Sequence, residues 1–413
     1  MYSIRLCLKS FFVFFLLSCQ SKNVEDSLTS NSTSTINHED TIKKEIVVGA
    51  EKLEQLQELI NDKSVALVAN QTSMVGNTHL ADTLLSLEVD LKSVFSPEHG
   101  FRGDADAGEK VNSGKDLKTG LTLHSLYGSN KKPTSDQLKG IDVVIFDIQD
   151  VGARFYTYIS TLHYVMEACA ESKIQLIILD RPNPNGQQID GPVLKKGFES
   201  FVGMHPIPII HGMTIAEYGQ MINGEKWLKN NMNCNLKVVK CDNYSHDSSY
   251  SLPVAPSPNL RSDQSIALYP SLCLFEGTIL SVGRGTETPF EIFGHPVLKL
   301  NPNKYDFEFT PVSSYGAKEP KLEGEKCFGK DLSSFEIENG KLNLEWIIET
   351  YKDMNRSDYF ITKNKWFDLL AGTEELRKQI ENGLSESEIR ASWDEDLKKF
   401  GLIREKYLIY DAK

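Results

Sequence analysis

Short apolar runs separated by polar segments set the architecture expected for the first half of the chain. Each run is rich in large aliphatic residues, as in a strand that is buried on both faces. The four runs are Val65–Ala69, Leu91–Phe95, Val143–Phe146 and Gln175–Leu179. Apolar residues with helical spacing lie before or between them, at 53–60, 79–87 and 161–171. This alternation predicts an α/β fold, with a mostly parallel sheet and helices on both of its faces.

Polar and charged side chains follow each of the four runs. Ligands of open α/β sheets bind outside the carboxyl ends of the strands, so we expect these side chains to share one cleft. The alternative is four ordinary turns, which explain the Asn and Pro residues better than the paired charges. The side chains are Asn70 and Gln71; Glu98, His99 and Arg102; Asp147, Gln149 and Asp150; and Asp180, Arg181 and Asn183.

The loop Ser96–Gly103 is the expected floor of that cleft. Its sequence, Ser-Pro-Glu-His-Gly-Phe-Arg-Gly, breaks the preceding strand and places a carboxylate, an imidazole and a guanidinium side by side. Charged groups at the end of an apolar strand are costly unless they face a cleft or one another. The alternative is a polar turn whose charges are solvated.

The segment from Asp147 to Tyr158 is dense in groups that bind polar ligands. Arg154 is able to hold a ligand carboxylate through two parallel hydrogen bonds. Tyr156 and Tyr158 are suited to stacking on a sugar or to donating hydrogen bonds. In the alternative, at least one tyrosine belongs to the core and Arg154 pairs with Asp150, four residues earlier.

Carboxylate chemistry with arginine and aromatic support favours glycoside cleavage, in which a neutral acid protonates the leaving oxygen. Glu98 is the candidate acid. Glycoside cleavage also needs a second group opposite the acid, unless an N-acetyl group of the substrate takes that role. The residues leave the second group open among Asp147, Asp150, Glu109 and Tyr156.

The remaining chain predicts a second structural region. Residues 104–125 form a polar excursion that we expect to be a long loop. Thr214-Ile-Ala-Glu217 is a capping box that opens a helix reaching Trp227, and His211 just before it is an uncertain member of the cleft. The proline-rich stretch 252–270 predicts a crossing to a second domain. From residue 345 onward the pattern is helical, with helix starts at 373 and 385 and a last strand at 407–410.

Length, charge and motifs exclude several classes of function. The 413 residues suggest two domains, and a net charge of -12 without a basic stripe argues against a nucleic-acid partner. There is no Gly-x-Ser-x-Gly elbow and no P-loop, and Gly283-Arg-Gly285 is only a fragment of a dinucleotide fingerprint. The histidines are too dispersed for a clear metal site, and Glu98, His99 and Asp104 are a weak candidate set of ligands. We predict neither a metal nor another cofactor.

The cysteine pattern is not that of a disulfide framework, because five scattered cysteines remain beyond the N-terminal segment. Cys169 and Cys273 have apolar neighbours and are expected in the core. Cys234 and Cys241 are a weak candidate pair for an oxidising compartment.

The N-terminus has the pattern of a secretory signal. Arg5 and Lys9 precede an apolar run, Phe11–Leu17, which is too short to span a bilayer. Leu-Leu-Ser-Cys at 16–19 is similar to a lipoprotein box, which predicts a signal peptide at 1–18 and lipidation of Cys19. An ordinary signal peptide is the alternative. Residues 19–46 are rich in Ser, Thr and Asn and predict a flexible tether.

Six stretches of the sequence resemble a family once labelled a domain of unknown function and now associated with exo-β-N-acetylmuramidases. They are 68–73 (VANQTS), 95–103 (FSPEHGFRG), 146–158 (FDIQDVGARFYTY), 179–186 (LDRPNPNG), 256–260 (PSPNL) and 274–278 (LFEGT). The likeness runs from about residue 47 to the C-terminus. Arg261 stands where the family pattern leads us to expect Pro.

The resemblance implies a Rossmann-like catalytic domain at 47–255 and a smaller α+β domain at 256–413. It implies release of N-acetylmuramic acid from the non-reducing ends of peptidoglycan fragments, with Glu98 as the catalytic acid. Arg102, Arg154, Arg181 or Arg284 would then bind the lactyl carboxylate of the sugar, and Glu276 lies in one of the matching stretches. A lipid-anchored protein of the periplasm would meet such fragments. A lipoprotein that binds wall glycans without cutting them is the alternative function.

Overall fold

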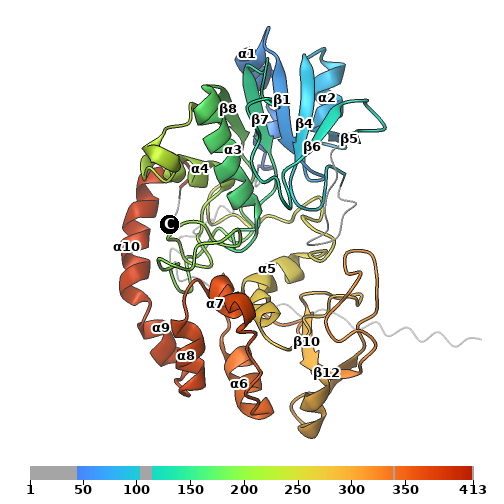
Figure 1. The fold of residues 1–413 in the computed structure, drawn as a ribbon, viewed down its shortest axis with the longest axis vertical. Helices are drawn as coiled ribbons and strands as arrows, with labels where there is room; N and C mark the ends of the chain where they lie inside the picture. Colours follow the sequence, from blue (N-terminus) through green and yellow to red (C-terminus); the bar gives the residue numbers. More distant parts are fainter. Residues whose placement is uncertain (1–43, 103–113, 338–339, 412–413) are drawn as a thin grey trace, which may run out of the picture. The chain divides into compact units, whose positions relative to one another are not determined.

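The computed structural model describes residues 44–102, 114–337 and 340–411, and its central feature is a seven-stranded sheet (Figure 1). In spatial order the strands are β5 (Gly114–Lys115), β6 (Thr122–Ser125), β4 (Leu91–Ser96), β1 (Val65–Ala69), β7 (Val143–Asp147), β8 (Gln175–Leu179) and β9 (Leu236–Val239). All neighbours are parallel except β5 and β6. Taken in chain order, the six parallel strands have the Rossmann order 3-2-1-4-5-6. The predicted fold class is confirmed.

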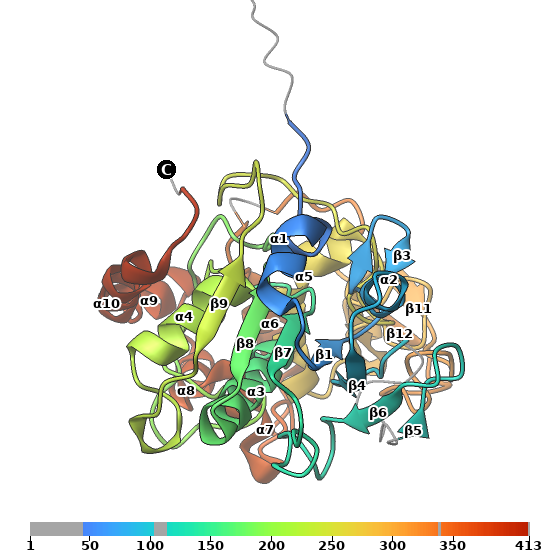
Figure 2. The ribbon, with the colours of Figure 1, turned by 90° about the horizontal axis from the view of Figure 1, so that it is seen from above.

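Helices cover both faces of the sheet because successive strand residues point to opposite sides. In β1, Ala66 and Val68 join one core cluster, whereas Val65, Leu67 and Ala69 join another. The first cluster includes residues of α3 (Tyr158–Ser172) and α4 (Ile215–Gly224). The second includes residues of α1 (Leu53–Ile60) and α2 (Leu80–Ser86). Figure 2 shows the sheet between these helices from above.

The C-terminal region combines a small sheet with helices. Its sheet has the order β10 (Ile292–His295), β12 (Cys327–Asp331) and β11 (Phe307–Phe309), all antiparallel. Its helices are α5 (Asp263–Leu272), α6 (Glu345–Met354), α7 (Trp366–Ala371), α8 (Glu375–Glu381), α9 (Glu386–Ala391) and α10 (Asp394–Arg404). A two-stranded hairpin, β2 (Met74–Val75) with β3 (Thr78–His79), completes the strands described.

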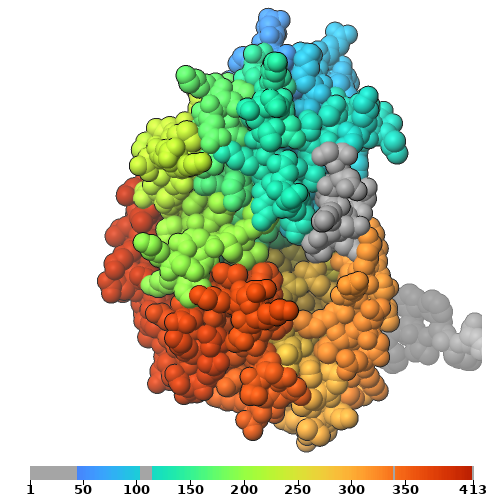
Figure 3. Space-filling view, viewed as in Figure 1, coloured from blue at the N-terminus to red at the C-terminus, as the bar shows by residue number. Residues whose placement is uncertain are grey.

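The two regions share one core. The cluster on the α3 side of the sheet continues into α5, α6, α7 and α8, so residues from Glu45 onward form one compact unit. Figure 3 shows the later part of the chain, in orange and red, packed below the green and teal part. The predicted domain boundary between residues 255 and 256 stays a prediction.

Helix boundaries follow local signals closely, with two differences. The capping box predicted at Thr214 is formed, and the helix start predicted at Ser385 is also a capping box. The Thr214 helix ends at Gly224 rather than Trp227, and Lys226 beyond it has a positive φ of 59° that no helix residue adopts. Helix α3 begins at Tyr158, three residues before the predicted start at Thr161.

Two predictions about irregular segments were wrong. The excursion 104–125 is not a loop throughout, because β5 and β6 extend the sheet beyond β4. Residues 407–410 form no strand: a short 3-10 helix, Glu405–Tyr407, ends there. The Tyr410 hydroxyl instead donates a hydrogen bond to Asp180 Oδ2 at 2.7 Å, so this aromatic segment packs against the end of β8. Strand β9 was not predicted.

The cysteines of the described residues are all free thiols. Cys169 and Cys273 are buried in the core, as predicted. Cys234 does not pair with Cys241: it lies beside Cys169, and the Cys241 thiol donates to the Asp180 carbonyl.

Several predictions fall outside the described residues: the signal peptide at 1–18, Cys19, nearly all of the tether at 19–46, and Asp104 and Glu109. Within the part that is described, no helix has both the length and the apolar character needed to cross a membrane.

Candidate active site

A cavity of about 530 Å³ opens at the carboxyl ends of β4 and β6, beside the first turn of α3. Its volume falls within the roughly 300–1,000 Å³ that is typical of small-molecule sites. Helices α5 and α7 complete its wall from the C-terminal region. The residues that line it are Glu98, His99, Tyr127, Gly128, Lys131, Phe155, Tyr156, Thr157, Tyr158, Phe201, Val202, Ser257, Leu260, Tyr269, Cys273, Glu276, Arg284, Phe290, Trp366 and Leu370.

Glu98 lies on this wall, half-buried, two residues after the end of β4. Thr157, the residue before α3, donates its hydroxyl to Glu98 Oε2 at 2.8 Å. Tyr127 follows β6 and also hydrogen-bonds to this carboxylate. Burial, together with the charge of Glu98, raises the pKa of Tyr127 well above its usual range. Two hydroxyl groups therefore hold one carboxyl group in a fixed orientation at the cavity.

His99 gives the chain its turn after Glu98. Its φ of 71° is in the left-handed region, which is uncommon for a residue other than glycine, and Gly100 follows with a φ of 80°. His99 is nevertheless 5% exposed and lines the cavity. Local backbone strain of this kind is often found at functional sites, where it fixes the direction of a neighbouring side chain.

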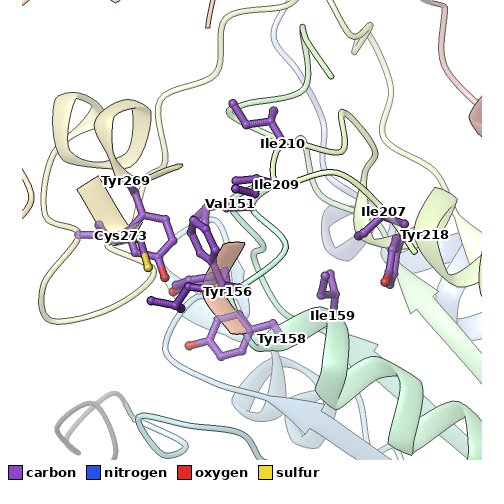
Figure 4. Packing of buried hydrophobic residues seen from close by; sticks show 14 of the residues in the cluster. Val151, Tyr156, Tyr158, Ile159, Ile207, Ile209, Ile210, Tyr218, Tyr269 and Cys273 are labelled. Carbon is purple, nitrogen blue, oxygen red and sulfur yellow. The ribbon is translucent and has the colours of Figure 1, made fainter. Parts of the chain in front are cut away.

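Three tyrosines form the inner wall of the cavity (Figure 4). The Tyr156 ring lies edge-on to Tyr158 at 4.8 Å and to Tyr269 at 5.7 Å. The hydroxyls of Tyr156 and Tyr158 both donate to the Pro256 carbonyl, at 2.8 and 3.2 Å. Because these hydroxyls are engaged, the rings offer an apolar wall of the kind that stacks on a sugar.

An ion pair forms another part of the wall, beside Phe290, whose ring contacts Tyr269. Arg284 Nε donates to Glu276 Oε1 at 2.6 Å, and the Arg284 guanidinium lies 4.9 Å from the centre of the Phe290 ring. The carboxylate raises the pKa of Arg284 despite its burial. The indole of Trp366 donates to the Glu276 carbonyl at 3.1 Å, which ties this wall to α7. Both charged residues predicted from the C-terminal region thus line the cavity.

Comparison with known proteins identifies the family. Models of the N-terminal and C-terminal domains of the exo-β-N-acetylmuramidase NamZ match residues 65–264 and 267–410. The chain belongs to the NamZ family. It is 38% identical over 407 residues to the peptidoglycan β-N-acetylmuramidase NamZ of Bacillus subtilis, covering 93% of this chain and 96% of that protein.

Solved structures of Bacteroides fragilis support the same assignment. One DUF1343 family protein is 43% identical with a TM-score of 0.82, covering 90% of this chain and 100% of that one. A second is 30% identical with a TM-score of 0.73, covering 89% of this chain and 99% of that one. The NamZ fold of this chain is therefore shared with experimental structures.

Other strand-end charges lie away from the cavity of this NamZ family member. Asp147, a candidate second catalytic group, is fully buried and bonded to Arg181 through both oxygens, at 2.6 and 2.9 Å. Arg181 also donates to the Met74 carbonyl, and neither residue lines the cavity. We therefore revise both assignments: this ion pair joins β7 to β8 and leaves no charge available for a ligand.

Asp180 is likewise engaged within the protein. Its carboxyl oxygens accept hydrogen bonds from the Thr214 hydroxyl, the Ala216 amide and the Tyr410 hydroxyl. Burial, reinforced by the neighbouring Glu217 charge, raises the pKa of Asp180 to about 7. Asn183 is buried beside it and donates to the Met213 carbonyl. Both residues anchor the start of α4 rather than a ligand.

Asp150 and His211 form a buried contact of 3.8 Å that is not part of the cavity wall. Burial raises the pKa of Asp150 to about 7 and lowers that of His211 to about 3, helped there by the charges of Arg404 and Arg154. The two groups therefore face each other uncharged near pH 6. Gln149 donates to the Asp150 and Pro182 carbonyls. These residues shape the loop after β7, and we no longer assign them to the ligand.

Arg154 is the largest fully buried side chain of the fold. Its guanidinium donates to the carbonyls of Pro192, Ile207 and Leu370 at 2.7–2.9 Å. Burial lowers the pKa of Arg154 to about 9. It neither lines the cavity nor pairs with Asp150, so both sequence interpretations of this residue were wrong.

Arg102 pairs with Asp116 at 2.9 Å and approaches Asp82 at 3.5 Å. It does not line the cavity. These ion pairs connect the loop after β4 with α2 and with the turn before β6. They give Arg102 a structural role that requires no bound ligand.

Asn70 and Gln71, just after the end of β1, form hydrogen bonds with residues that line or support the cavity. The Asn70 amide donates to the Tyr158 hydroxyl at 2.8 Å, and the Gln71 amide donates to the Pro256 carbonyl at 3.0 Å. The Pro256 carbonyl thus receives bonds from Gln71, Tyr156 and Tyr158. These hydrogen bonds hold the segment that carries Ser257 against the start of α3. Asn70 and Gln71 therefore position the residues that line the cavity but do not line it themselves.

Sequence reasoning missed Tyr127, Lys131, Thr157, Tyr269 and Trp366, which all line the cavity. Tyr127 and Lys131 follow β6, so they would have been found by the strand-end rule had that strand been recognised. Thr157 lies inside a stretch that resembles the family. Tyr269 and Trp366 come from the C-terminal region, where no local pattern marks them. Among the residues with described positions, no cluster of three potential metal ligands exists.

Proposed function

We propose that the protein is an exo-acting glycosidase that releases N-acetylmuramic acid from the non-reducing ends of peptidoglycan fragments. Membership of the NamZ family and the 38% identity to a peptidoglycan β-N-acetylmuramidase support this activity. The observation that carries the proposal is the position of Glu98: a carboxyl on the wall of an aromatic cavity, oriented by Thr157 and Tyr127.

Glu98 is the general acid in this proposal. Its carboxyl protonates the glycosidic oxygen as the bond to the anomeric carbon breaks, and the leaving sugar departs as an alcohol. A water molecule then supplies the hydroxyl on the anomeric carbon and returns a proton to the Glu98 carboxylate. The hydrogen bond from Thr157 to Oε2 fixes the plane of the carboxyl and so the direction of proton transfer. The tyrosine wall excludes water from one side of the sugar and supports its ring.

We infer that few of the candidates for the second catalytic group remain suitable. Among the described carboxylates, only Glu98 and Glu276 line the cavity, and Glu276 is paired with Arg284. Tyr156 is fully buried, donates to the Pro256 carbonyl and has its pKa raised well above the usual range, so it is a poor nucleophile. The N-acetyl group of the substrate is the candidate that needs no further protein carboxylate, and Glu109 lies outside the described residues.

The test is hydrolysis of a disaccharide with β-linked N-acetylmuramic acid at its non-reducing end, by the wild type and by Glu98→Gln, because a sugar leaving group must be protonated as it departs. We expect kcat of the variant to fall by about 100- to 10,000-fold, as for loss of a general acid, with an unchanged melting temperature. Glu54→Gln, an exposed carboxyl on α1, is the matched control and should keep full activity. Saturable binding of the sugar without any product would favour the glycan-binding alternative, and full activity of Glu98→Gln would remove Glu98 from the mechanism.

We also propose that Cys19 is lipidated after removal of residues 1–18, that 19–46 is a tether, and that the enzyme is a periplasmic lipoprotein. The lipoprotein-like sequence at 16–19 supports this placement. Cell fractionation tests it: the wild type should sediment with membranes and Cys19→Ala should not. Recovery of the wild type in the soluble fraction would contradict the anchor.

A further inference from the structure

The wall of the cavity carries a lysine that forms no ion pair with any carboxylate whose position the structure describes. Two cations line it, Arg284 and Lys131. Arg284 is paired with Glu276 at 2.6 Å, so that wall is close to neutral. Lys131 makes no ion pair with any carboxylate in the described ranges 44–102, 114–337 and 340–411. Its ammonium is therefore the cation of the cavity wall that is not held in an ion pair within the described part of the chain.

Aromatic packing holds Lys131 in place without cancelling its charge. The Nζ atom lies 4.3 Å from the centre of the Phe201 ring, and both residues line the cavity. Phe201 is itself stacked on Tyr164 with ring centres 6.3 Å apart. A cation over an aromatic face keeps its full charge, and the ring limits the freedom of the lysine stem. The ammonium is thus preorganised for an anion.

The adjacent lysine shows what an ordinary structural role looks like in the same segment. Lys132 pairs with Glu167 at 2.7 Å and with Glu171 at 2.6 Å, both on α3, and it does not line the cavity. Two consecutive residues of the same type therefore have different environments: one is neutralised by a helix, and the other faces the site.

A short segment after β6 carries both Lys131 and Tyr127, the residue that hydrogen-bonds to the candidate acid Glu98. Tyr127, which hydrogen-bonds to Glu98, is four residues before Lys131, and both follow β6. In a muramoyl unit the scissile bond is at C1 and the lactyl carboxylate is carried on C3 of the same ring. One sugar bound in the cavity would therefore offer an oxygen to Glu98 and a carboxylate to a cation elsewhere on the wall.

We propose that Lys131 is the specificity-determining residue of the site, binding the lactyl carboxylate and selecting muramoyl over glucosaminyl units. The proposal rests on the proposed function. It replaces the earlier expectation of an arginine, because Arg102, Arg154 and Arg181 are engaged within the fold and Arg284 is neutralised by Glu276. A hydrogen bond from an ammonium to a carboxylate in a partly buried site is stronger than a neutral one.

The experiment compares three 4-nitrophenyl β-glycosides: N-acetylmuramide, its lactyl methyl ester, and N-acetylglucosaminide. We expect Lys131→Met to lower kcat/KM for the muramide by about 10- to 100-fold, as for loss of a hydrogen bond to a charged group. The ester and the glucosaminide carry no charge, so their kcat/KM should change by less than about threefold. Lys131→Arg should keep most of the preference, and Lys132→Met, the matched control, should keep all of it.

Three results would overturn the assignment. They are an equal loss of activity on all three substrates in Lys131→Met, an unchanged preference in that variant, and a wild type that hydrolyses acid and ester equally well. The last comparison needs no variant, so it is able to overturn the proposal even if Lys131→Met does not fold. A wild type without activity on any of the substrates would defeat the proposed function instead. Calorimetry of free N-acetylmuramic acid and N-acetylglucosamine, with wild type and Lys131→Met, then tests Lys131 separately.

Discussion

The strands β4, β7 and β8 are parallel, so their carboxyl ends lie along one edge of the sheet, and the charged residues there differ in what covers them. At the β4 end, Glu98 faces a cavity of about 530 Å³ and is oriented by hydroxyl groups. At the β7 and β8 ends, Asp147 and Asp180 are fully buried and bonded to protein groups on every side that the structure describes. The sequence pattern is the same in each place, an apolar strand followed by a carboxylate.

The difference teaches that a strand-end carboxylate is functional only where the rest of the chain leaves it a free approach. Arg181 closes the β7 end, and Thr214 and Tyr410 close the β8 end. At the β4 end, α5 and α7 stand back far enough to leave a cavity between them and Glu98. Burying a carboxylate requires a partner, and a partner leaves the carboxylate unavailable for chemistry.

Breaking the buried ion pair should give the largest effect on stability. Arg181→Met leaves Asp147 as a buried charge without a cation, and we expect unfolding free energy to fall by about 3–5 kcal/mol. The double variant Arg181→Met with Asp147→Asn removes both charges and should recover more than half of the loss. Urea denaturation measures both. Glu98→Gln, after the parallel strand β4, should leave the urea midpoint unchanged. A single variant as stable as the wild type would show that the pair is not structural.

The buried Asp150 should make the stability of the protein depend on pH. Its pKa of about 7 in the folded protein, against an ordinary 3.8, means that the folded chain holds a proton which the unfolded chain has released. Stability should therefore decrease as pH rises from about 4 to 7, by at most about 4 kcal/mol and more realistically by about half of that.

The measurement is the free energy of unfolding at several pH values for the wild type and Asp150→Asn. The substituted asparagine cannot ionise, so the free energy of unfolding of Asp150→Asn should decrease less between about pH 4 and 7 than that of the wild type. The difference in favour of the variant should be greatest above about pH 7. Asp136→Asn, an exposed residue, is the control and should follow the wild type. Parallel curves for wild type and Asp150→Asn would show that Asp150 ionises normally.

The smallest effect should come from the hydrogen bond that orients the acid. Thr157→Val removes the hydroxyl that donates to Glu98 and should lower kcat/KM for the muramide by about tenfold, or about 1.4 kcal/mol. The melting temperature should change little, since Thr157 is half-buried. Thr157→Ser keeps the hydroxyl and should restore most of the activity. Equal losses in Val and Ser variants would indicate a packing role instead.

Local sequence signals predicted the sheet well. Each of the four apolar runs is a strand, and the capping boxes at Thr214 and Ser385 both open helices. Strand β6 escaped notice because it is polar: it lies near the edge of the sheet, where one side is exposed to solvent. For the aromatic segment 407–410 the sequence predicted a strand that does not form. Its Tyr410 side chain instead packs inside the protein and donates a hydrogen bond to Asp180.

The site was predicted in part. Glu98, His99, Tyr156 and Tyr158 line the cavity, and so do Glu276 and Arg284. Arg154 could not be recognised as structural from its own surroundings, because one of its carbonyl partners, Leu370, is 216 residues away. The same holds for Asp180, whose partner Tyr410 is 230 residues away.

The sequence by itself determined four strands of the central sheet, their alternation with helices, the family and the place of Glu98 at a strand end. These are properties of neighbouring residues, since backbone preferences and apolar periodicity act over one strand or one turn. Only the tertiary structure decided which charges are neutralised and which face the cavity. Burial and pairing depend on segments that meet in space: Asp147 pairs with Arg181 and Asp180 bonds to Tyr410, whereas Lys131 and Glu98 line the same cavity.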